Sequence, residues 1–329
     1  MIKNKSFAKD KIGVLLLAYN SISTVEKCIL SAKRISRQIV LVDSGSTDGT
    51  ENLCSRLGAE IYFRKWDNNF AAQRNFALAH IRTEWVLMLD SDEFLSEFTL
   101  DKFTEIISNP LIGGINFKII NILDGGKTSS SHHYTRMFRR EKGIMFEGRI
   151  HEQIRSSIIG NGFVIYDSDF EIIHTGYSQP DSRKFDRNIK MLENEILNFG
   201  TNDFLKYHLA STYFAKGDND KALELFDKLT DSFQLSPMQI DILRIRMAQI
   251  YLQKGDYKRV MELTDFISED IDLEGLKNFI LAAVLISDNK FSKAYQLLQN
   301  DSTQKSSLID KLILNESIFK LNRILGVHK

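Results

Sequence analysis

Short apolar runs alternate with longer amphipathic stretches between residues 12 and 121, and this alternation constrains the fold more than any other feature of the chain. The apolar runs lack polar alternation, which is typical of strands buried on both faces. The stretches between them have the spacing of amphipathic helices. The pattern therefore predicts an α/β domain with a mostly parallel, doubly wound sheet covered by helices. The expected strands are Ile12–Ala18, Ile39–Val42, Glu60–Phe63, Trp85–Leu89 and Gly114–Ile120, and the expected helices are Thr24–Arg34, Thr50–Leu57, Phe70–Ile81 and Leu100–Ile107.

The pattern changes twice after this region. Residues 122–176 contain paired glycines, a serine run and mixed aromatic and basic residues, which predicts loops and antiparallel strands that close the sheet edge. Pro180 marks a boundary, and the chain beyond it has helical spacing almost throughout. We therefore expect an α/β domain at residues 1–180 and an all-α domain at residues 181–329.

Three similar segments follow one another in the helical part. Each has an apolar helix, a turn and a second helix, and the turn residues are 38 and 34 residues apart: Gly217, Gly255 and Asn289. A small residue follows each turn and would let the paired helices approach: Ala222, Val260 and Ala294. The segments resemble tetratricopeptide repeats, whose helical hairpins recur at about 34 residues. A helical domain without repeats is the alternative.

Composition excludes several classes of function. Lys plus Arg (43) equal Asp plus Glu (43), so a mainly electrostatic grip on nucleic acid is not expected. The cysteines, Cys28 and Cys54, fall inside expected helices, which favours a reducing compartment without disulfides. Met1–Lys11 has no apolar core typical of a secretion signal, and the longest apolar runs are too short to span a membrane. A cytoplasmic protein without a transmembrane segment is the expectation.

Two of the apolar strands end in acidic residues. Asp43 follows Ile39–Val42, and Asp90-Ser91-Asp92-Glu93 follows the strand at residues 85–89. The carboxyl ends of parallel strands meet at one sheet edge, where doubly wound folds bind ligands. Converging carboxylates need a positive partner, and Asp90 with Asp92 suits Mg²⁺ or Mn²⁺ holding a nucleoside diphosphate. A solvated acidic loop is the alternative.

The segments that carry the site residues have little resemblance to two common nucleotide-binding motifs. The first strand runs into Ala18-Tyr19-Asn20-Ser21, without the glycine fingerprint of dinucleotide-binding domains, and no phosphate loop with Gly-Lys-Ser/Thr occurs. A dehydrogenase or a P-loop enzyme is therefore not expected. We expect Asp43 to point at the ligand and accept hydrogen bonds from a base or ribose.

Several motifs in this order resemble family 2 glycosyltransferases of the GT-A fold, a Rossmann-like α/β fold, over about residues 12–180. They are Leu17-Ala18-Tyr19-Asn20, Val42-Asp43-Ser44-Gly45-Ser46-Thr47-Asp48-Gly49-Thr50, Phe70-Ala71-Ala72-Gln73-Arg74-Asn75 and Leu89-Asp90-Ser91-Asp92-Glu93. With the helical repeats behind them, the chain is similar to a branch that includes the sublancin-type bacteriocin S-glycosyltransferases. The segments shared with that branch are Lys65-Trp66, Arg136-Met137-Phe138-Arg139, Phe146-Glu147-Gly148-Arg149-Ile150-His151-Glu152 and Ile173-His174-Thr175-Gly176-Tyr177.

The resemblance implies a role for each matching residue. The uridine diphosphate of a UDP-sugar would be bound by Ala18, Tyr19, Asn20, Asp43, Ser44, Arg74, Asp90 and Ser91. The metal, Mg²⁺ or Mn²⁺, would be bound by Asp90, Asp92 and His174. Members of the family are expected to invert the anomeric carbon by direct displacement, which requires a general base near the acceptor. Glu152, next to His151, is the candidate base and Glu93 the alternative, while a pair His151–Glu152 that only braces its loop is the structural reading.

The acceptor is the least determined part of the prediction. Stacked helical hairpins form a concave surface suited to peptides, so we expect the repeats to bind a peptide and deliver its Cys or Ser to the metal site, as in a bacteriocin precursor. A thiol ionises more easily than a hydroxyl and depends less on a base. A cell-surface glycan or lipid-linked acceptor is the alternative within the class. Outside the glycosyltransferases there are two alternatives. Asp90-x-Asp92 also resembles haloacid-dehalogenase-type phosphatases, and the chain could instead be a scaffold built of helical repeats. A homodimer is compatible with the repeats.

Overall fold

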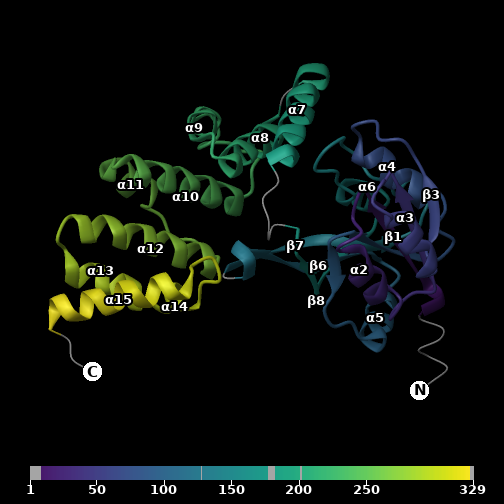
Figure 1. Ribbon diagram of the computed structural model, residues 1–329, viewed down its shortest axis with the longest axis horizontal. Coiled ribbons are helices and arrows are strands. Elements are labelled where there is room, and N and C mark those ends of the chain that lie inside the picture. The colour runs from purple at the N-terminus through teal and green to yellow at the C-terminus, as the bar shows by residue number, and fades with distance from the viewer. Residues whose placement is uncertain (1–8, 127, 177–181, 201, 327–329) are drawn as a thin grey trace. The chain divides into compact units, whose positions relative to one another are not determined.

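The computed structural model describes residues 9–126, 128–176, 182–200 and 202–326 (Figure 1). Pro180, the expected domain boundary, Tyr177 and the first eight residues lie outside this part of the chain. The chain divides into two compact units, Met1–Leu123 with Ser131–Ser178 and Asp124–Ser130 with Gln179–Lys329. Within the described residues, no helix combines the length and apolar character that a membrane crossing requires.

The first unit is built on an eight-stranded sheet with the order β3-β2-β1-β4-β7-β6-β8-β5. Its strands are β1 Ile12–Ala18, β2 Gln38–Asp43, β3 Glu60–Phe63, β4 Trp85–Asp90, β5 Glu93–Leu95, β6 Ile112–Leu123, β7 Thr128–Arg139 and β8 Val164–His174. Parallel pairs join β1 to β2 and β4, β2 to β3, and β6 to β8. Antiparallel pairs join β4 to β7 and β5 to β8. The predicted mostly parallel sheet is confirmed, although β7 separates β6 from the parallel strands around β1.

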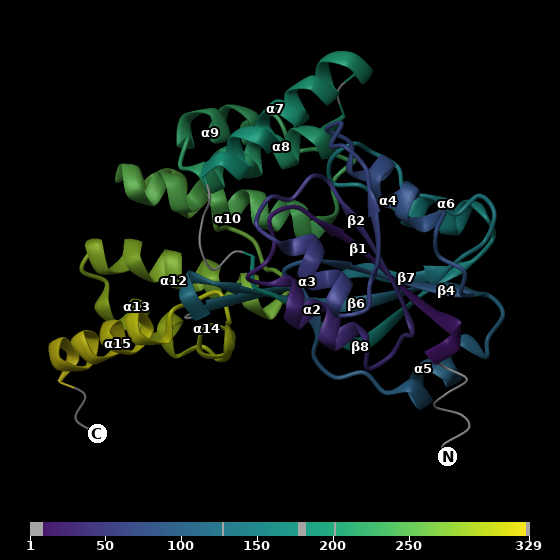
Figure 2. The ribbon, with the colours of Figure 1, turned by 45° about the vertical axis from the view of Figure 1, so that its right-hand side comes forward.

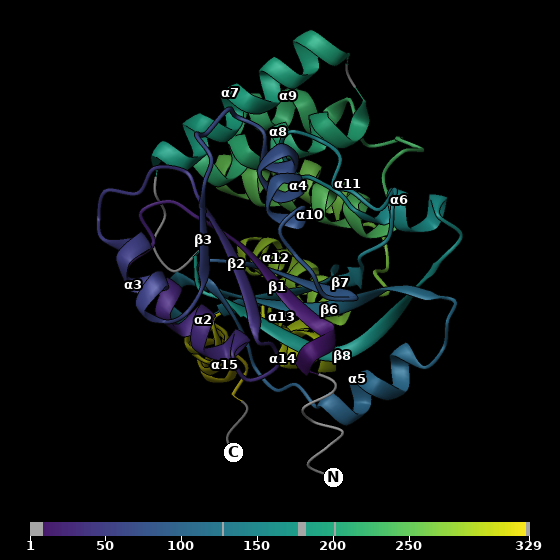
Figure 3. The same cartoon turned by 90° about the vertical axis from the view of Figure 1, so that its right-hand side faces the viewer.

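Helices cover both faces of this sheet because both faces are apolar. Its helices are α2 Val25–Ala32, α3 Thr50–Arg56, α4 Phe70–Leu78, α5 Leu100–Ile107 and α6 Arg155–Gly160. A short 3₁₀ turn at Asp124–Gly126 lies between β6 and β7, in the second unit. One core contains α2, α3 and α5 side chains, and a second core on the other face contains α4 and α6 side chains. Figure 2 shows α2 and α3 together on one side, and Figure 3 shows α4 and α6 on the opposite side. Cys28 and Cys54 are buried, free thiols in α2 and α3.

The second unit consists of helical hairpins (Figure 1). Its helices are α7 Ser182–Phe199, α8 Asp203–Lys216, α9 Asn219–Asp227, α10 Pro237–Lys254, α11 Tyr257–Leu263, α12 Ile271–Ser287, α13 Phe291–Gln299, α14 Asp301–Lys305 and α15 Lys311–Leu325. The predicted turn residues Gly217, Gly255 and Asn289 all have left-handed backbone, with φ of 86°, 74° and 58°. The small residues that follow them are fully buried: Ala222, Val260 and Ala294. The predicted repeats of paired helices, α8–α9, α10–α11 and α12–α13, are therefore confirmed as TPR-like.

The tip of the β6–β7 hairpin belongs to the second unit. There the Ser129 N–H donates to the Ser307 carbonyl (3.0 Å), and the Ser307 hydroxyl donates to the Ser129 carbonyl (3.0 Å). The two units are thus separate in packing but not consecutive in sequence.

Candidate active site

The loops that follow β1 and β2 are joined by hydrogen bonds at the carboxyl edge of the sheet. The Asn20 N–H donates to Ser46 Oγ (2.8 Å), and Asn20 Oδ1 accepts from the Thr47 N–H (2.8 Å). The Ser44 N–H donates to the Ala18 carbonyl (3.1 Å). Asn20 has a φ of 48°, a left-handed conformation that asparagine tolerates better than most residues. These bonds fix the shape of the edge where the sequence predicts nucleotide binding.

Asp43 is directed into its own loop. Its Oδ1 accepts from the N–H groups of Gly45 (2.8 Å) and Ser46 (2.7 Å), and its Oδ2 accepts from the Ser46 hydroxyl (2.5 Å). The residue is buried. The sequence predicts that the Asp43 carboxylate points at a ligand, and the structure differs. The turn after the strand supplies three hydrogen-bond donors, and the carboxylate accepts from these instead.

An aromatic side chain is exposed at the same edge. Tyr19, directly after the buried strand β1, is 60% exposed. An exposed aromatic ring at a strand end offers a stacking surface for a base. Ser91, in the turn after β4, donates its hydroxyl to Ser21 Oγ (2.8 Å) and so joins this turn to the β1 loop.

A cluster of ion pairs lies below the turn after β4. Arg74 of α4 donates from Nη2 to Asp90 Oδ1 (2.7 Å) and from Nε to Glu152 Oε1. Arg136 of β7 donates from Nη2 to Glu93 Oε1 (2.5 Å) and lies 3.6 Å from Asp90 Oδ2. Glu93 also accepts the Asp90 N–H (3.0 Å). The two guanidiniums, both buried, thus hold the three predicted carboxylates together.

The pKa values of the cluster follow from burial and these pairs. Partial burial would raise the pKa of Asp90, but the charges of Arg74 and Arg136 outweigh it and hold this pKa well below its usual range. Burial raises the pKa of Glu93 to about 7, against the opposing charge of Arg136. Glu93 has a side chain with no exposed surface, so it cannot contact an acceptor directly. Its contacts are those of a brace for Arg136 and Asp90, and its role as the alternative base stays a prediction.

Asp92 meets His174 beside this cluster. Strands β5 and β8 pair so that Glu93 lies opposite His174, and the Asp92 carbonyl accepts from Thr175 N (3.1 Å) and Oγ1 (3.0 Å). As a result Asp92 Oδ1 lies 3.4 Å from His174 Nε2. Burial would lower the pKa of His174, but the hydrogen bond and charge of Asp92 outweigh it and the pKa is raised. Residues 82 positions apart in the sequence therefore form one pair.

The pair has features of a metal site. His174 Nδ1 lies 2.9 Å from Asn121 Oδ1, so the ring can donate from Nδ1 to this oxygen while its Nε2 faces Asp92. In this tautomer a bound cation would take the place of the Nε2 proton. A Cβ at Gly176 would lie 2.1 Å from Asp92 Oδ2 and 2.9 Å from His174 Nε2, so only glycine leaves this space open. Carboxylate and imidazole with open positions suit a divalent cation completed by phosphate oxygens and water.

The predicted set of three metal ligands is not formed. Across the described part of the chain, no three His, Cys, Asp or Glu side chains are grouped so that they could hold a metal ion. Asp90 is turned to the two arginines instead: its Oδ1 lies 2.7 Å from Arg74 Nη2 and its Oδ2 lies 3.6 Å from Arg136 Nη2. The same contacts disfavour the phosphatase alternative, since a carboxylate paired with two guanidiniums is a weak nucleophile.

Glu152 is carried by a braced loop. The Glu147 and Gln153 main chains exchange two hydrogen bonds of 2.9 Å and close the loop at its base. Asn75 of α4 exchanges two further hydrogen bonds of 2.9 Å with the Phe146 main chain. Tyr134 Oη donates to the Glu152 carbonyl (2.5 Å). Glu152 is thereby held against Arg74, and its role as a base stays a prediction.

His151 occupies the bend of the same loop. Its φ is 53°, an uncommon conformation for a residue with a side chain. Burial lowers the pKa of His151 to about 4, so the ring is neutral near pH 7 and cannot supply a positive charge there. This favours the structural reading of His151 as part of the loop.

Some residues of the site escape sequence reasoning. Asn121 ends the apolar run of β6, as Asp43 and Asp90 end theirs, so the same strand-end signal could have found it. Tyr134 and Asn75 carry no such signal, because each acts on the main chain of a loop that is distant in sequence. Arg74 has two nitrogens bound to carboxylates, and Nη1 has no hydrogen-bond partner among the described residues.

The fold is an α/β domain with a mostly parallel sheet, followed by TPR-like helices. Residues 14–172 match the model of the family Glycosyl transferase family 2. Over 189 residues the chain is 26% identical to the SPbeta prophage-derived glycosyltransferase SunS of Bacillus subtilis. The aligned region covers 54% of this chain and 43% of SunS. A TPR repeat-containing protein of Synechococcus elongatus is 25% identical over 153 residues, 46% of this chain and 37% of that protein. The match thus spans less than half of either relative.

Among solved structures, Staphylococcus aureus TarS is similar over 77% of this chain and 54% of TarS, with a TM-score of 0.43 and 17% identity.

Proposed function

We propose that this protein is an inverting glycosyltransferase that uses Mg²⁺ or Mn²⁺ and a UDP-sugar, with glucose as the expected sugar. The acceptor we propose is a Cys or Ser of a bacteriocin precursor peptide. The observation that carries the proposal is the Asp92–His174 pair at the carboxyl edge of the sheet, in the unit whose residues 14–172 match the family 2 model.

The donor would bind across the loops after β1, β2 and β4. The exposed Tyr19 ring is suited to stack on uracil, while Asn20 and Ser44 lie on the joined loops that would face the ribose. Asp43 would act by holding its loop in shape. Ser91, bonded to Ser21, would keep the β4 turn in register with the β1 loop.

The diphosphate would lie beside Asp92 and His174, which would hold the cation. When bound, the cation neutralises the charge that develops on the leaving diphosphate. Arg74 would orient Asp90 and Glu152 through two different nitrogens and so couple the donor side to the acceptor side. Glu93 would keep Arg136 against Asp90.

In the transfer step, the acceptor sulfur or oxygen forms a bond to the anomeric carbon from the face opposite UDP. The bond between that carbon and the diphosphate oxygen breaks, and UDP leaves with the electron pair. The acceptor proton passes to the Glu152 carboxylate, which Arg74 holds in an ion pair. A thiol acceptor would depend less on Glu152 because it ionises more easily.

The test is incubation of the full chain with UDP-glucose, Mn²⁺ and Cys- or Ser-bearing precursor peptides, followed by mass spectrometry. The proposal expects a mass gain of one hexose on the peptide and release of UDP. UDP release without a peptide mass gain across a panel of UDP-sugars would remove the peptide acceptor and favour the glycan or lipid-linked alternative.

A further inference from the structure

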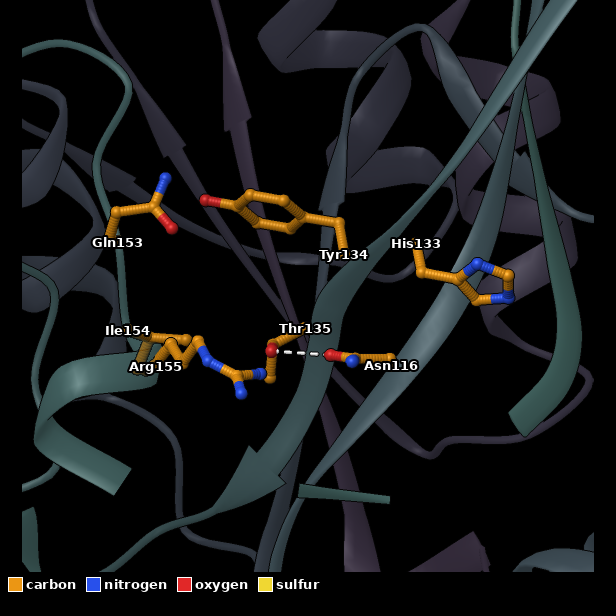
Figure 4. A pocket seen from close by; sticks show the side chains of 7 residues that line it. All are labelled: Asn116, His133, Tyr134, Thr135, Gln153, Ile154 and Arg155. Carbon is orange, nitrogen blue, oxygen red and sulfur yellow. Dashed lines mark hydrogen bonds between the residues drawn. The ribbon is translucent and has the colours of Figure 1, made fainter. Parts of the chain in front are cut away.

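A polar pocket lies beside the loop that carries Glu152 (Figure 4). Its volume is about 110 Å³. The residues that matter for its chemistry are Asn116, His133, Tyr134, Thr135, Gln153 and Arg155. All of them belong to the first unit, so the pocket is a feature of the α/β domain.

The pocket is connected directly to the proposed base. The Tyr134 ring lines it, while Tyr134 Oη donates to the Glu152 carbonyl (2.5 Å). Gln153, the next residue in the chain, also lines it, and Figure 4 shows its amide near the Tyr134 hydroxyl end. A group bound in this pocket would therefore lie next to Glu152, where an acceptor has to approach.

Most neutral donors of the pocket are already used. The Thr135 hydroxyl donates to Asn116 Oδ1 (2.6 Å), and Asn116 Nδ2 donates to Asp167 Oδ1 (2.6 Å). Gln153 Nε2 donates to the His151 carbonyl (3.1 Å). The pocket therefore has few neutral donors left for a ligand.

Arg155 is different. It is exposed, and no hydrogen bond or ion pair joins its guanidinium to another of the residues that the structure describes. A guanidinium with all its donors unused, in a pocket whose other donors are engaged, favours a planar anion. The cavity would hold only a few heavy atoms, since one water takes about 30 Å³.

We propose that this pocket binds a carboxylate side chain of the acceptor peptide, close in sequence to the residue that receives the sugar. The proposal rests on the proposed function for the acceptor being a peptide. It deepens that function by giving the acceptor a chemical requirement, an acidic residue near its Cys or Ser.

The experiment uses synthetic peptides that contain one Cys and, at each of the three positions on either side, Glu, Gln or phosphoserine. Transfer from UDP-glucose is followed by mass spectrometry, and peptide binding by fluorescence anisotropy of labelled peptides. In the wild type, one Glu position should lower KM by about ten-fold relative to Gln, as one charge-assisted hydrogen bond implies. Arg155→Gln should abolish this difference and leave kcat unchanged.

The matched control is Arg56→Gln, which removes an exposed arginine from α3 on the other face of the sheet. It should keep the Glu preference intact. A preference for phosphoserine over Glu that Arg155→Gln removes would overturn the carboxylate and assign a phosphate instead. Equal KM for Glu and Gln peptides, or a Glu preference that survives Arg155→Gln, would overturn the pocket assignment alone. If neither peptide gains mass while UDP-glucose is hydrolysed, the proposed peptide acceptor fails.

Discussion

The two acidic strand ends of the first unit look alike in sequence but differ in what they contact. After β2, Asp43 is satisfied by donors of its own loop, at Gly45 and Ser46. After β4, Asp90 and Asp92 are satisfied by Arg74, Arg136 and His174, which come from three other elements. The first strand end is closed locally, and the second is held by long-range pairs.

This difference separates a structural from a ligand-binding carboxylate. A carboxylate that caps its own loop has both oxygens occupied before any ligand arrives. Asp92 instead faces His174 across a space that is open because residue 176 is a glycine. This carboxylate can therefore bind a cation. The strand-end position alone does not distinguish the two, and substitutions at the two ends should.

The largest effect is expected at the buried brace of the second strand end. Glu93→Ala leaves the buried Arg136 without its 2.5 Å partner, and this should lower the free energy of unfolding by about 3–5 kcal/mol. Urea unfolding measures the change. Glu97→Ala, at an exposed position nearby, should change it by less than about 0.5 kcal/mol. Equal stability of the two variants would show that the ion-pair cluster does not support the fold.

Asp92→Asn tests the open carboxylate. It should reduce turnover of UDP-sugar by at least about 100-fold, because metal sites lose this much when a ligand shell is disrupted. Stability should change by less than about 1 kcal/mol, since Asp92 and His174 are partly exposed. Turnover is measured as UDP release with Mn²⁺ present. A variant with full activity would discard the metal assignment.

Tyr19→Ala tests the exposed ring at the shared edge. Loss of base stacking should raise KM for the UDP-sugar about ten-fold, within the range known for one base on one aromatic side chain. Tyr19→Phe keeps the ring and should keep KM. If both variants behave alike, whether both fail or both work, stacking is not what Tyr19 contributes.

The smallest effect is expected at the locally closed end. Asp43→Asn keeps one oxygen for the Gly45 and Ser46 N–H groups, so it should cost about 1 kcal/mol of stability and change donor KM only a few-fold. Steady-state kinetics and thermal unfolding measure both. A large rise in KM at unchanged stability would instead place the Asp43 carboxylate on the nucleotide and erase the contrast between the strand ends.

The repetitive parts of the molecule are the parts that the sequence predicts well. The strands β1 and β3 and the helix α5 have the predicted bounds. In β1 and α5 the reason is burial, on both faces of the strand and on one face of the helix, which requires a regular pattern of apolar residues. The turns at Gly217, Gly255 and Asn289 are equally readable, since their left-handed backbone favours glycine and asparagine. These strands, helices and turns depend on residues that are close together in the sequence, so they can be predicted from it.

The site was predicted only in its location. The sequence places Asp43, Asp90 and Asp92 at one sheet edge, and β1 pairs with both β2 and β4 as that argument requires. It could not give the partners of these carboxylates, because Arg136 and His174 reach them through the strand order of β7, β8 and β5. A carboxylate pairs with the nearest positively charged side chain in the folded protein. Which side chain is nearest depends on how the strands pair across the whole sheet.

The proposed activity depends most on Asp92 and His174 binding a cation together with a nucleoside diphosphate. Isothermal titration calorimetry of UDP into the wild type and Asp92→Asn, each with and without Mn²⁺, tests this directly. We predict that Mn²⁺ strengthens UDP binding to the wild type and has no such effect on Asp92→Asn. UDP binding that is independent of Mn²⁺ in the wild type, or equally dependent on it in both proteins, would contradict a cation site at Asp92 and His174.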